Sequence, residues 1–179
     1  MKKTTVFIGR EAELVTLNQA HNKKTAQLIV IRGRRRIGKS RLIEEFVKGK
    51  QHFRFAGIAP ESAYTAQTQR DFFTSQLAEQ TSLPNMQVLD WVNLFNLLAK
   101  QTHQKPVTII FDEITWMSDK DPTFLGKLKE VWDVHFSQNP ALTLILCGSV
   151  STWIEKNIIS SSGFLGRITL TLNLRPLAL

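Results

Sequence analysis

Apolar residues gather in short continuous runs that alternate with longer amphipathic stretches. Continuous runs of this kind are typical of strands buried on both faces, and the clearest cover residues 27–31, 107–111 and 142–147. Residues 52–56 form a weaker, aromatic-rich run that we interpret as a further strand. Over residues 168–174 apolar and polar positions alternate strictly, which predicts a strand with one less covered face, at an edge of the sheet.

The stretches between these runs have helical periodicity. The most regular apolar stripes cover residues 88–99 and 124–136, and Asp121 is expected as N-cap of the second helix with Pro122 in its first turn. Less regular helices are expected at residues 11–22, 38–47 and 67–80, and a short one at 151–157. Strands that alternate with helices predict an α/β fold, in which helices cover both faces of a parallel sheet.

Composition fits one ordinary globular domain. The chain has 179 residues, of which 42% are hydrophobic and 21% charged. The apolar runs are too short for a membrane span and residues 1–5 lead into no signal-peptide core, so a cytoplasmic protein without a membrane partner is expected. The single cysteine, Cys147, excludes an intramolecular disulfide and a cysteine-cluster metal site.

Positive charge is concentrated at one end of the chain. The net charge is +8, and residues 1–60 alone hold 14 basic and 4 acidic residues. Such a cluster attracts anions, which include both nucleic-acid backbones and nucleotide phosphates. Charge therefore leaves both kinds of partner open, and the motifs must decide between them.

The most specific motif lies directly after the first predicted strand. Residues 33–40, GRRRIGKS, satisfy G-x-x-x-x-G-K-[ST] at every fixed position, and a helical pattern follows. Backbone N–H groups of such a loop bind phosphates, Lys39 is expected to reach the β- and γ-phosphates, and the Ser40 hydroxyl is expected to ligate Mg²⁺. The loop residues expected to bind ATP are Gly33, Arg34, Arg35, Arg36, Ile37, Gly38, Lys39, Ser40 and Arg41.

Two further motifs end buried strands. Asp112 and Glu113 follow the run at 107–111; Asp112 is expected to hold Mg²⁺ through its waters, and Glu113 to accept a proton from the attacking water. Ser149 follows the run at 142–147 and has two compatible interpretations. It contacts the γ-phosphate or the attacking water, or it caps the helix at 151–157.

Together with residues 7–14 and 165–167, these motifs resemble the archaeal-type ATPase family, an AAA+/STAND-like branch of the P-loop ATPases. The resemblance implies a three-layer P-loop fold whose five parallel strands have the order 5-1-4-3-2. It also implies that Gly9, Arg10 and Glu11 line the adenine side of the site. Arg167 lies where related ATPases place an arginine that senses the γ-phosphate, in cis or across a subunit boundary; a structural salt bridge is the alternative.

The resemblance also implies more than this chain contains. Residues 1–179 are expected to form the ATPase core, whereas family members continue into a helical lid or winged-helix region and an effector domain. The chain ends in the apolar segment 175–179, so we expect those regions to be absent. A homo-oligomer or protein partner would then depend on the absent C-terminal region.

The resulting hypothesis is an ATPase that hydrolyses ATP to ADP and phosphate with Mg²⁺ and acts as a conformational switch. The catalytic residues expected are Lys39, Glu113, Ser149 and Arg167, and the metal ligands are Ser40 and Asp112. One alternative is a DNA-associated module that ATP regulates through the basic first third. The other is a small-molecule P-loop kinase, although no arginine-rich lid is found. A GTP switch is disfavoured because no N-K-x-D segment follows Glu113.

Overall fold

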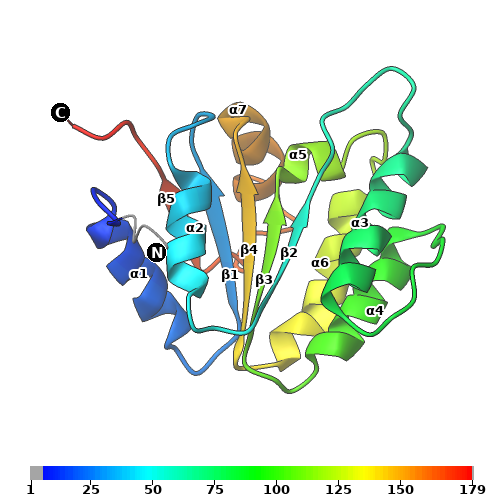
Figure 1. Ribbon diagram of the computed structural model, residues 1–179, viewed down its shortest axis with the longest axis horizontal. Coiled ribbons are helices and arrows are strands. Elements are labelled where there is room, and N and C mark those ends of the chain that lie inside the picture. The colour runs from blue at the N-terminus through cyan, green and yellow to red at the C-terminus, as the bar shows by residue number, and fades with distance from the viewer. Residues whose placement is uncertain (1–5, 179) are drawn as a thin grey trace, which may run out of the picture.

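The fold is built on one five-stranded parallel sheet. The computed structural model describes residues 6–178, so the expected leaderless start at 1–5 and the last residue of the apolar end, Leu179, lie outside the described residues. The strands follow one another across the sheet as β2-β3-β4-β1-β5 (Figure 1), which confirms the expected order. They are β1 (Gln27–Arg32), β2 (His52–Ala56), β3 (Val107–Asp112), β4 (Leu142–Gly148) and β5 (Leu170–Asn173).

Helices cover both faces of the sheet and make three layers. Two of them, α1 (Glu11–His21) and α2 (Lys39–Val47), lie on one face, and α3 (Ala66–Gln80), α4 (Trp91–Thr102) and α6 (Phe124–Val134) lie on the other (Figure 1). Short elements complete the chain: α5 (Ile114–Met117), α7 (Ser151–Ile154), a 3-10 turn at Phe136–Gln138 and a π-helical turn at Glu155–Ile159. None of the helices in the described residues is both long and apolar enough to cross a membrane.

The strands supply side chains to both layers of helices in alternation. Leu28 and Val30 belong to the core beneath α3, α4 and α6, whereas Ile29 and Ile31 belong to the core beneath α1 and α2. β1, β3 and β4 are buried along nearly their whole length, while β5 is only half-buried because it pairs with β1 alone. The expected edge position of β5 is therefore confirmed.

The opposite edge of the sheet is closed by glutamine side chains of α3. The outward backbone N–H groups of Arg54, Ala56 and Ile58 donate to the side-chain oxygens of Gln80, Gln76 and Gln69 at 2.8, 2.8 and 2.9 Å. The amide NH₂ groups of the same glutamines donate to the three matching carbonyls at 2.8, 3.1 and 2.8 Å. Each glutamine thus replaces one residue of a neighbouring strand, and the free edge of β2 is satisfied without one.

Replacement of the central glutamine tests this edge. Gln76→Leu keeps the side chain's bulk but leaves the N–H and C=O of Ala56 without partners, which we expect to cost about 1 to 3 kcal/mol of unfolding free energy. Urea denaturation measures this loss. Gln101→Leu on α4 is the matched control, because Gln101 has no hydrogen bond to β2 among residues 6–178. Equal stability of the two variants would contradict the role of Gln76.

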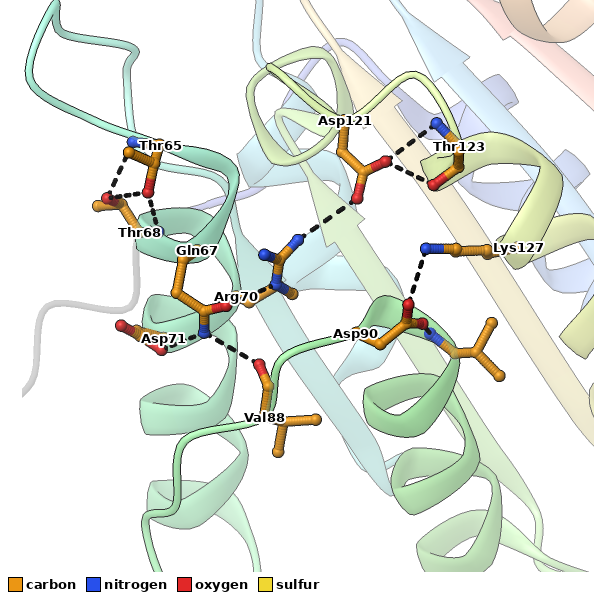
Figure 2. A network of polar contacts seen from close by, with 11 residues as sticks. Thr65, Gln67, Thr68, Arg70, Asp71, Val88, Asp90, Asp121, Thr123 and Lys127 are labelled. Atoms are coloured by element: carbon orange, nitrogen blue, oxygen red, sulfur yellow. Dashed lines mark hydrogen bonds and ion pairs between the residues drawn. The ribbon is translucent and has the colours of Figure 1, made fainter.

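The amino-terminal ends of α3, α4 and α6 are joined by a polar network (Figure 2). Arg70 of α3 forms an ion pair with Asp121 at 3.3 Å, and both side chains are largely buried. Asp121 was expected as N-cap of α6, and this is wrong: the helix begins at Phe124 with Thr123 as its N-cap residue. The Asp121 carboxylate accepts hydrogen bonds from Thr123 instead, so Asp121 closes the preceding turn and ties it to α3.

Two other helix boundaries differ from the periodicity. Asp90 caps α4 by accepting from the Val92 N–H at 2.7 Å, so that helix begins at Trp91, and Val88 is buried in the preceding loop. The Lys127 ammonium lies 2.9 Å from Asp90 and holds the pKa of that carboxyl below its ordinary value. α6 ends at Val134 rather than at 136, because the chain tightens there into the 3-10 turn.

Candidate functional site

The site lies at the carboxyl ends of the central strands, where the phosphate loop leaves β1. Gly38 takes a left-handed conformation with φ 99° directly before α2, a conformation that glycine adopts without strain. The amino-terminal end of α2, which starts at Lys39, therefore lies beside the loop, and backbone N–H groups at a helix start can bind an anion. Gly33 is needed because a Cβ there would lie 2.8 Å from the Leu174 carbonyl oxygen.

Lys39 holds the loop in shape. Its side chain is buried, and Nζ donates to the Gly33 and Arg34 carbonyl oxygens at 2.6 and 2.7 Å. A lysine ammonium has three N–H donors, so one is left for an anion. Gly33 and Arg34 thus contribute to the loop through their main-chain carbonyls.

The phosphate loop and the acidic pair open into one cavity of about 790 Å³. Side chains of four basic and two acidic residues line it, so positive charge dominates. The lining residues are Arg35, Arg36, Gly38, Lys39, Ser40, Arg41, Asp112 and Glu113. A polar cavity of this size with excess positive charge is suited to a polyphosphate.

Both oxygens of the Asp112 carboxylate have partners within the chain. Oδ1 accepts the Glu113 N–H at 2.9 Å, and Oδ2 accepts from the Arg54 guanidinium at 2.8 Å. Arg54 lies on β2, where its register partner on β3 is Ile110, so its side chain reaches two residues along β3 toward the site. Arg54 had not been singled out from the sequence, although a charged residue between Phe53 and Phe55 was a visible signal.

Glu113 has an unusual backbone and one specific partner. Its φ and ψ are 52° and 51°, in the left-handed region that non-glycine residues rarely adopt and that is enriched at functional sites. The Ser149 hydroxyl donates to the Glu113 carboxylate, at 3.2 Å to Oε2. The alternative interpretation of Ser149 as a helix cap is wrong, because the N-cap residue of α7 is Val150 and no side chain caps that helix.

Glu113 directly precedes the short helix α5, which packs against the end of β2 and against the phosphate loop. A Cβ on Gly57, just after β2, would lie 2.8 Å from the Glu113 carbonyl oxygen and 2.6 Å from the Met117 backbone nitrogen. Only glycine therefore lets α5 pack this closely against the end of β2. From the other side, the Arg35 guanidinium lies 5.0 Å from the centre of the Trp116 ring, which joins α5 to the phosphate loop.

The residues expected to hold Mg²⁺ fit that ion. Ser40 and Asp112 line the same cavity and offer a hydroxyl and a carboxylate oxygen, the hard donors that Mg²⁺ prefers. Within residues 6–178 no three acidic, histidine or cysteine side chains form a cage for a metal. A site with two protein ligands suits Mg²⁺, which completes its coordination with water and substrate phosphates. Burial raises the pKa of the neighbouring Cys147 thiol, so this cysteine is an inert packing residue.

Arg10 joins three parts of the chain and does not line the cavity. Its buried guanidinium donates to Glu13 at 3.0 Å, to the Ile37 carbonyl of the phosphate loop at 2.9 Å and to the Arg175 carbonyl at 2.6 Å. Gly9 beside it packs against the C-terminal tail through Leu177. The segment with Gly9, Arg10 and Glu11 thus lies against the phosphate loop, and its contact with adenine stays a prediction.

Arg167 lies at the amino-terminal ends of the strands, whereas the phosphate loop lies at their carboxyl ends. It precedes β5, whose parallel pairing sets Thr169 beside Leu28 at the start of β1, whereas the phosphate loop follows the end of that strand. The Arg167 guanidinium forms a two-pronged ion pair with Asp133 at 2.7 and 2.9 Å, which lowers the pKa of that carboxyl. A sensing role for Arg167 at the chain's own site is therefore wrong on geometry, and the structural salt bridge is the interpretation that holds within the chain.

This geometry defines a P-loop nucleotide-binding domain. A family model described as an ATPase domain predominantly from Archaea matches residues 7–179. The chain belongs to this family of ATPases, as the sequence motifs had indicated.

Individual relatives extend the same similarity. An uncharacterized protein of Methanocaldococcus jannaschii, MJECL04, is 28% identical over an alignment of 177 positions that covers 96% of this chain and 36% of that protein. The Walker-type ATPase PABY2304 of Pyrococcus abyssi has a TM-score of 0.66 at 20% identity, over 97% of this chain and 55% of that one. The ORC2 protein of Aeropyrum pernix, solved in ADPNP–ADP complexes, has a TM-score of 0.62 at 17% identity, over 97% and 50%. The chain thus spans about a third to a half of these proteins.

Proposed function

We propose that this domain binds ATP with Mg²⁺ and hydrolyses it by activating a water molecule with Glu113. The observation that carries the proposal is the shared cavity, in which the phosphate loop faces Asp112 and Glu113. The free N–H of Lys39 and the first turn of α2 would bind the phosphates, and Ser40 and Asp112 would hold the metal. Bound Mg²⁺ would neutralise charge on the phosphate oxygens.

In the proposed reaction Glu113 accepts a proton from water, and the water oxygen forms a bond to the γ-phosphorus. The bond from that phosphorus to the β–γ bridging oxygen breaks, so ADP and phosphate leave. Ser149 supports this assignment because its hydroxyl donates to the Glu113 carboxylate and orients it. Ser149 lies directly after β4, and through this hydrogen bond to Glu113 it can report whether the γ-phosphate is present.

We further propose that nucleotide binding switches the conformation of a longer protein. The support is Arg10, whose guanidinium donates to the Ile37 carbonyl of the phosphate loop and to the Arg175 carbonyl of the C-terminal tail. A movement of the loop at Ile37 would therefore move the tail at Arg175 through the Arg10 side chain. This proposal includes the lid and effector regions, any oligomer or protein partner, and a contact of Arg167 with a neighbouring subunit. It also includes the AAA+/STAND assignment. The greater length of the relatives supports it.

The structure gives less support to the two other functions that the sequence leaves open, a DNA-associated module and a small-molecule kinase. Arg34, Arg35 and Arg36 are exposed, which is compatible with a DNA contact, but the last two also line the phosphate cavity. Salt-dependent retention on duplex DNA would support the DNA-associated module. The kinase alternative and the cytoplasmic location stay predictions.

Calorimetric titration with Mg-ATP and Mg-GTP tests nucleotide binding. We expect saturable binding of ATP, with GTP bound more weakly, and at least a tenfold weaker ATP affinity in Lys39→Ala, because the variant loses both the loop's internal tie and the free N–H donor. Lys100→Ala, on the exposed surface of α4, is the matched control. ATP binding that survives Lys39→Ala unchanged would contradict the proposed site.

A further inference from the structure

The Arg54 side chain extends from β2 to the carboxylate of Asp112, the residue proposed to hold the metal. Neither the phosphate motif nor the proposed reaction uses Arg54. Its ion pair with Asp112 is partly sheltered, with the two side chains 30% and 15% exposed. Ion pairs this close to the surface contribute little to stability, so stability alone does not explain an arginine in an aromatic edge strand. Its location beside Asp112, the residue proposed to hold the metal, suggests a role in metal binding.

The backbone of Arg54 is fixed on both sides. Its N–H donates to the side-chain oxygen of Gln80 and its carbonyl accepts from the same side chain, both at 2.8 Å. The strand itself pairs with β3, with Ala56 in register with Asp112. The guanidinium is therefore presented to the Asp112 carboxylate from a rigid base, and only its own side-chain torsions can move it away.

The guanidinium acts on Asp112 through charge rather than by filling its coordination positions. An ionised carboxylate has about four lone-pair directions. The Glu113 N–H and the Arg54 guanidinium use one each and the Cys147 thiol contacts the carboxylate as well, so its remaining directions are available to a ligand in the cavity that Asp112 lines. A divalent cation that approaches them meets the Arg54 charge in addition to the four basic residues that line the cavity.

We infer that Arg54 makes metal binding depend on the nucleotide. Without nucleotide, the positive charges of the cavity and of Arg54 outweigh Asp112 and Glu113, so a free divalent cation binds weakly. The phosphates of ATP bring enough negative charge to reverse this balance, and the metal then enters together with ATP. The inference rests on the proposed function, because it needs Asp112 as a metal-supporting residue.

Mn²⁺ binding to the nucleotide-free protein tests the inference without using catalysis. Free Mn²⁺ is measured by electron paramagnetic resonance during titration of the wild type, Arg54→Gln and Arg54→Lys. We expect Arg54→Gln to bind Mn²⁺ at least fivefold more tightly than the wild type, and Arg54→Lys, which keeps the charge, to stay within twofold of it. Lys100→Gln on exposed α4 removes the same charge at a distance and should also stay within twofold.

A second comparison shows whether the gain comes from Asp112. In Arg54→Gln/Asp112→Asn the tighter binding should disappear, because the carboxylate that Arg54 shields is gone. The same titrations with saturating ATP should show that ATP increases Mn²⁺ affinity by a smaller factor in Arg54→Gln than in the wild type, since nucleotide and metal affinities are linked.

The outcomes separate the inference from the proposed function. If Arg54→Gln binds Mn²⁺ no more tightly than the wild type, while ATP still promotes binding that requires Asp112, the inference is overturned and the proposed function stands. If ATP promotes no Mn²⁺ binding that requires Asp112, both fall. A Tm of each variant within a few degrees of the wild type confirms that the comparison is made between folded proteins.

Discussion

Glu113→Gln should lower the rate of ATP hydrolysis by about 100- to 10,000-fold, the contribution typical of a general base. The amide has nearly the same shape as the carboxylate but cannot accept the proton from water. ATP affinity should stay within a few-fold of the wild type, because the phosphate loop and Asp112 are unchanged. Phosphate release under saturating Mg-ATP, together with calorimetric titration, measures both quantities.

Glu79→Gln is the matched control for this variant. It makes the same chemical change on the exposed surface of α3 and should hydrolyse ATP at the wild-type rate. A Glu113→Gln protein that also kept the wild-type rate would remove Glu113 from the role of base. A variant that lost ATP binding as well would show instead that the Glu113 carboxylate, which accepts from Ser149, is needed to shape the cavity.

The central strands and the phosphate loop could be predicted from sequence because each is encoded locally. The continuous apolar runs of β1, β3 and β4 have one structural solution in an alternating α/β chain, a strand covered on both sides. The loop at 33–40 needs glycine, lysine and serine at fixed spacing, so the motif itself specifies the local geometry. The strand order, by contrast, came from the family resemblance rather than from any local pattern.

Features that depend on distant segments could not be predicted in this way. Arg167 has the same local sequence whether it senses phosphate or pairs with Asp133, and only the parallel register of β5 excludes the chain's own site. The pairing of Arg54 with Asp112 joins residues 58 positions apart. Likewise, the glutamines of α3 have the spacing of an ordinary polar helix face, and their hydrogen bonds appear only when the helix lies along β2.

The helix boundaries show the same limit at short range. Both Asp90 and Asp121 precede an amphipathic stretch and are good N-cap residues by type, yet only Asp90 caps its helix. Asp121 is engaged by Arg70 of α3 and by Thr123, so a tertiary ion pair competes with the local role. Capping preferences therefore identify candidates, while packing decides between them.

Phe73→Ala should destabilise the domain by about 3 to 5 kcal/mol, the cost typical of truncating a fully buried aromatic residue. The Phe73 ring is 1% exposed and stacks on Phe55 of β2 with ring centres 4.1 Å apart. It also forms T-shaped contacts with Trp91 on α4 and Phe111 on β3, with ring centres 5.4 and 5.7 Å apart. Since single domains are stable by about 5 to 15 kcal/mol, this loss is a large share of the total. The midpoint and slope of urea denaturation measure it.

Phe72→Ala is an unusually close control, because it deletes the same ring from the adjacent residue of the same helix. Phe72 is 37% exposed, so its loss should cost at most about 1 kcal/mol, within the range of surface substitutions and partial burial. Comparable losses in both variants would mean that α3 is held by helix propensity and its glutamines rather than by the aromatic cluster. If the cluster holds α3, it also holds the base from which Arg54 faces Asp112, since Phe73 packs against the strands on both sides of that ion pair. If the folded Phe73→Ala protein keeps the ion pair between Arg54 and Asp112 in place, saturating Mg-ATP should stabilise it by as much as it stabilises Phe72→Ala.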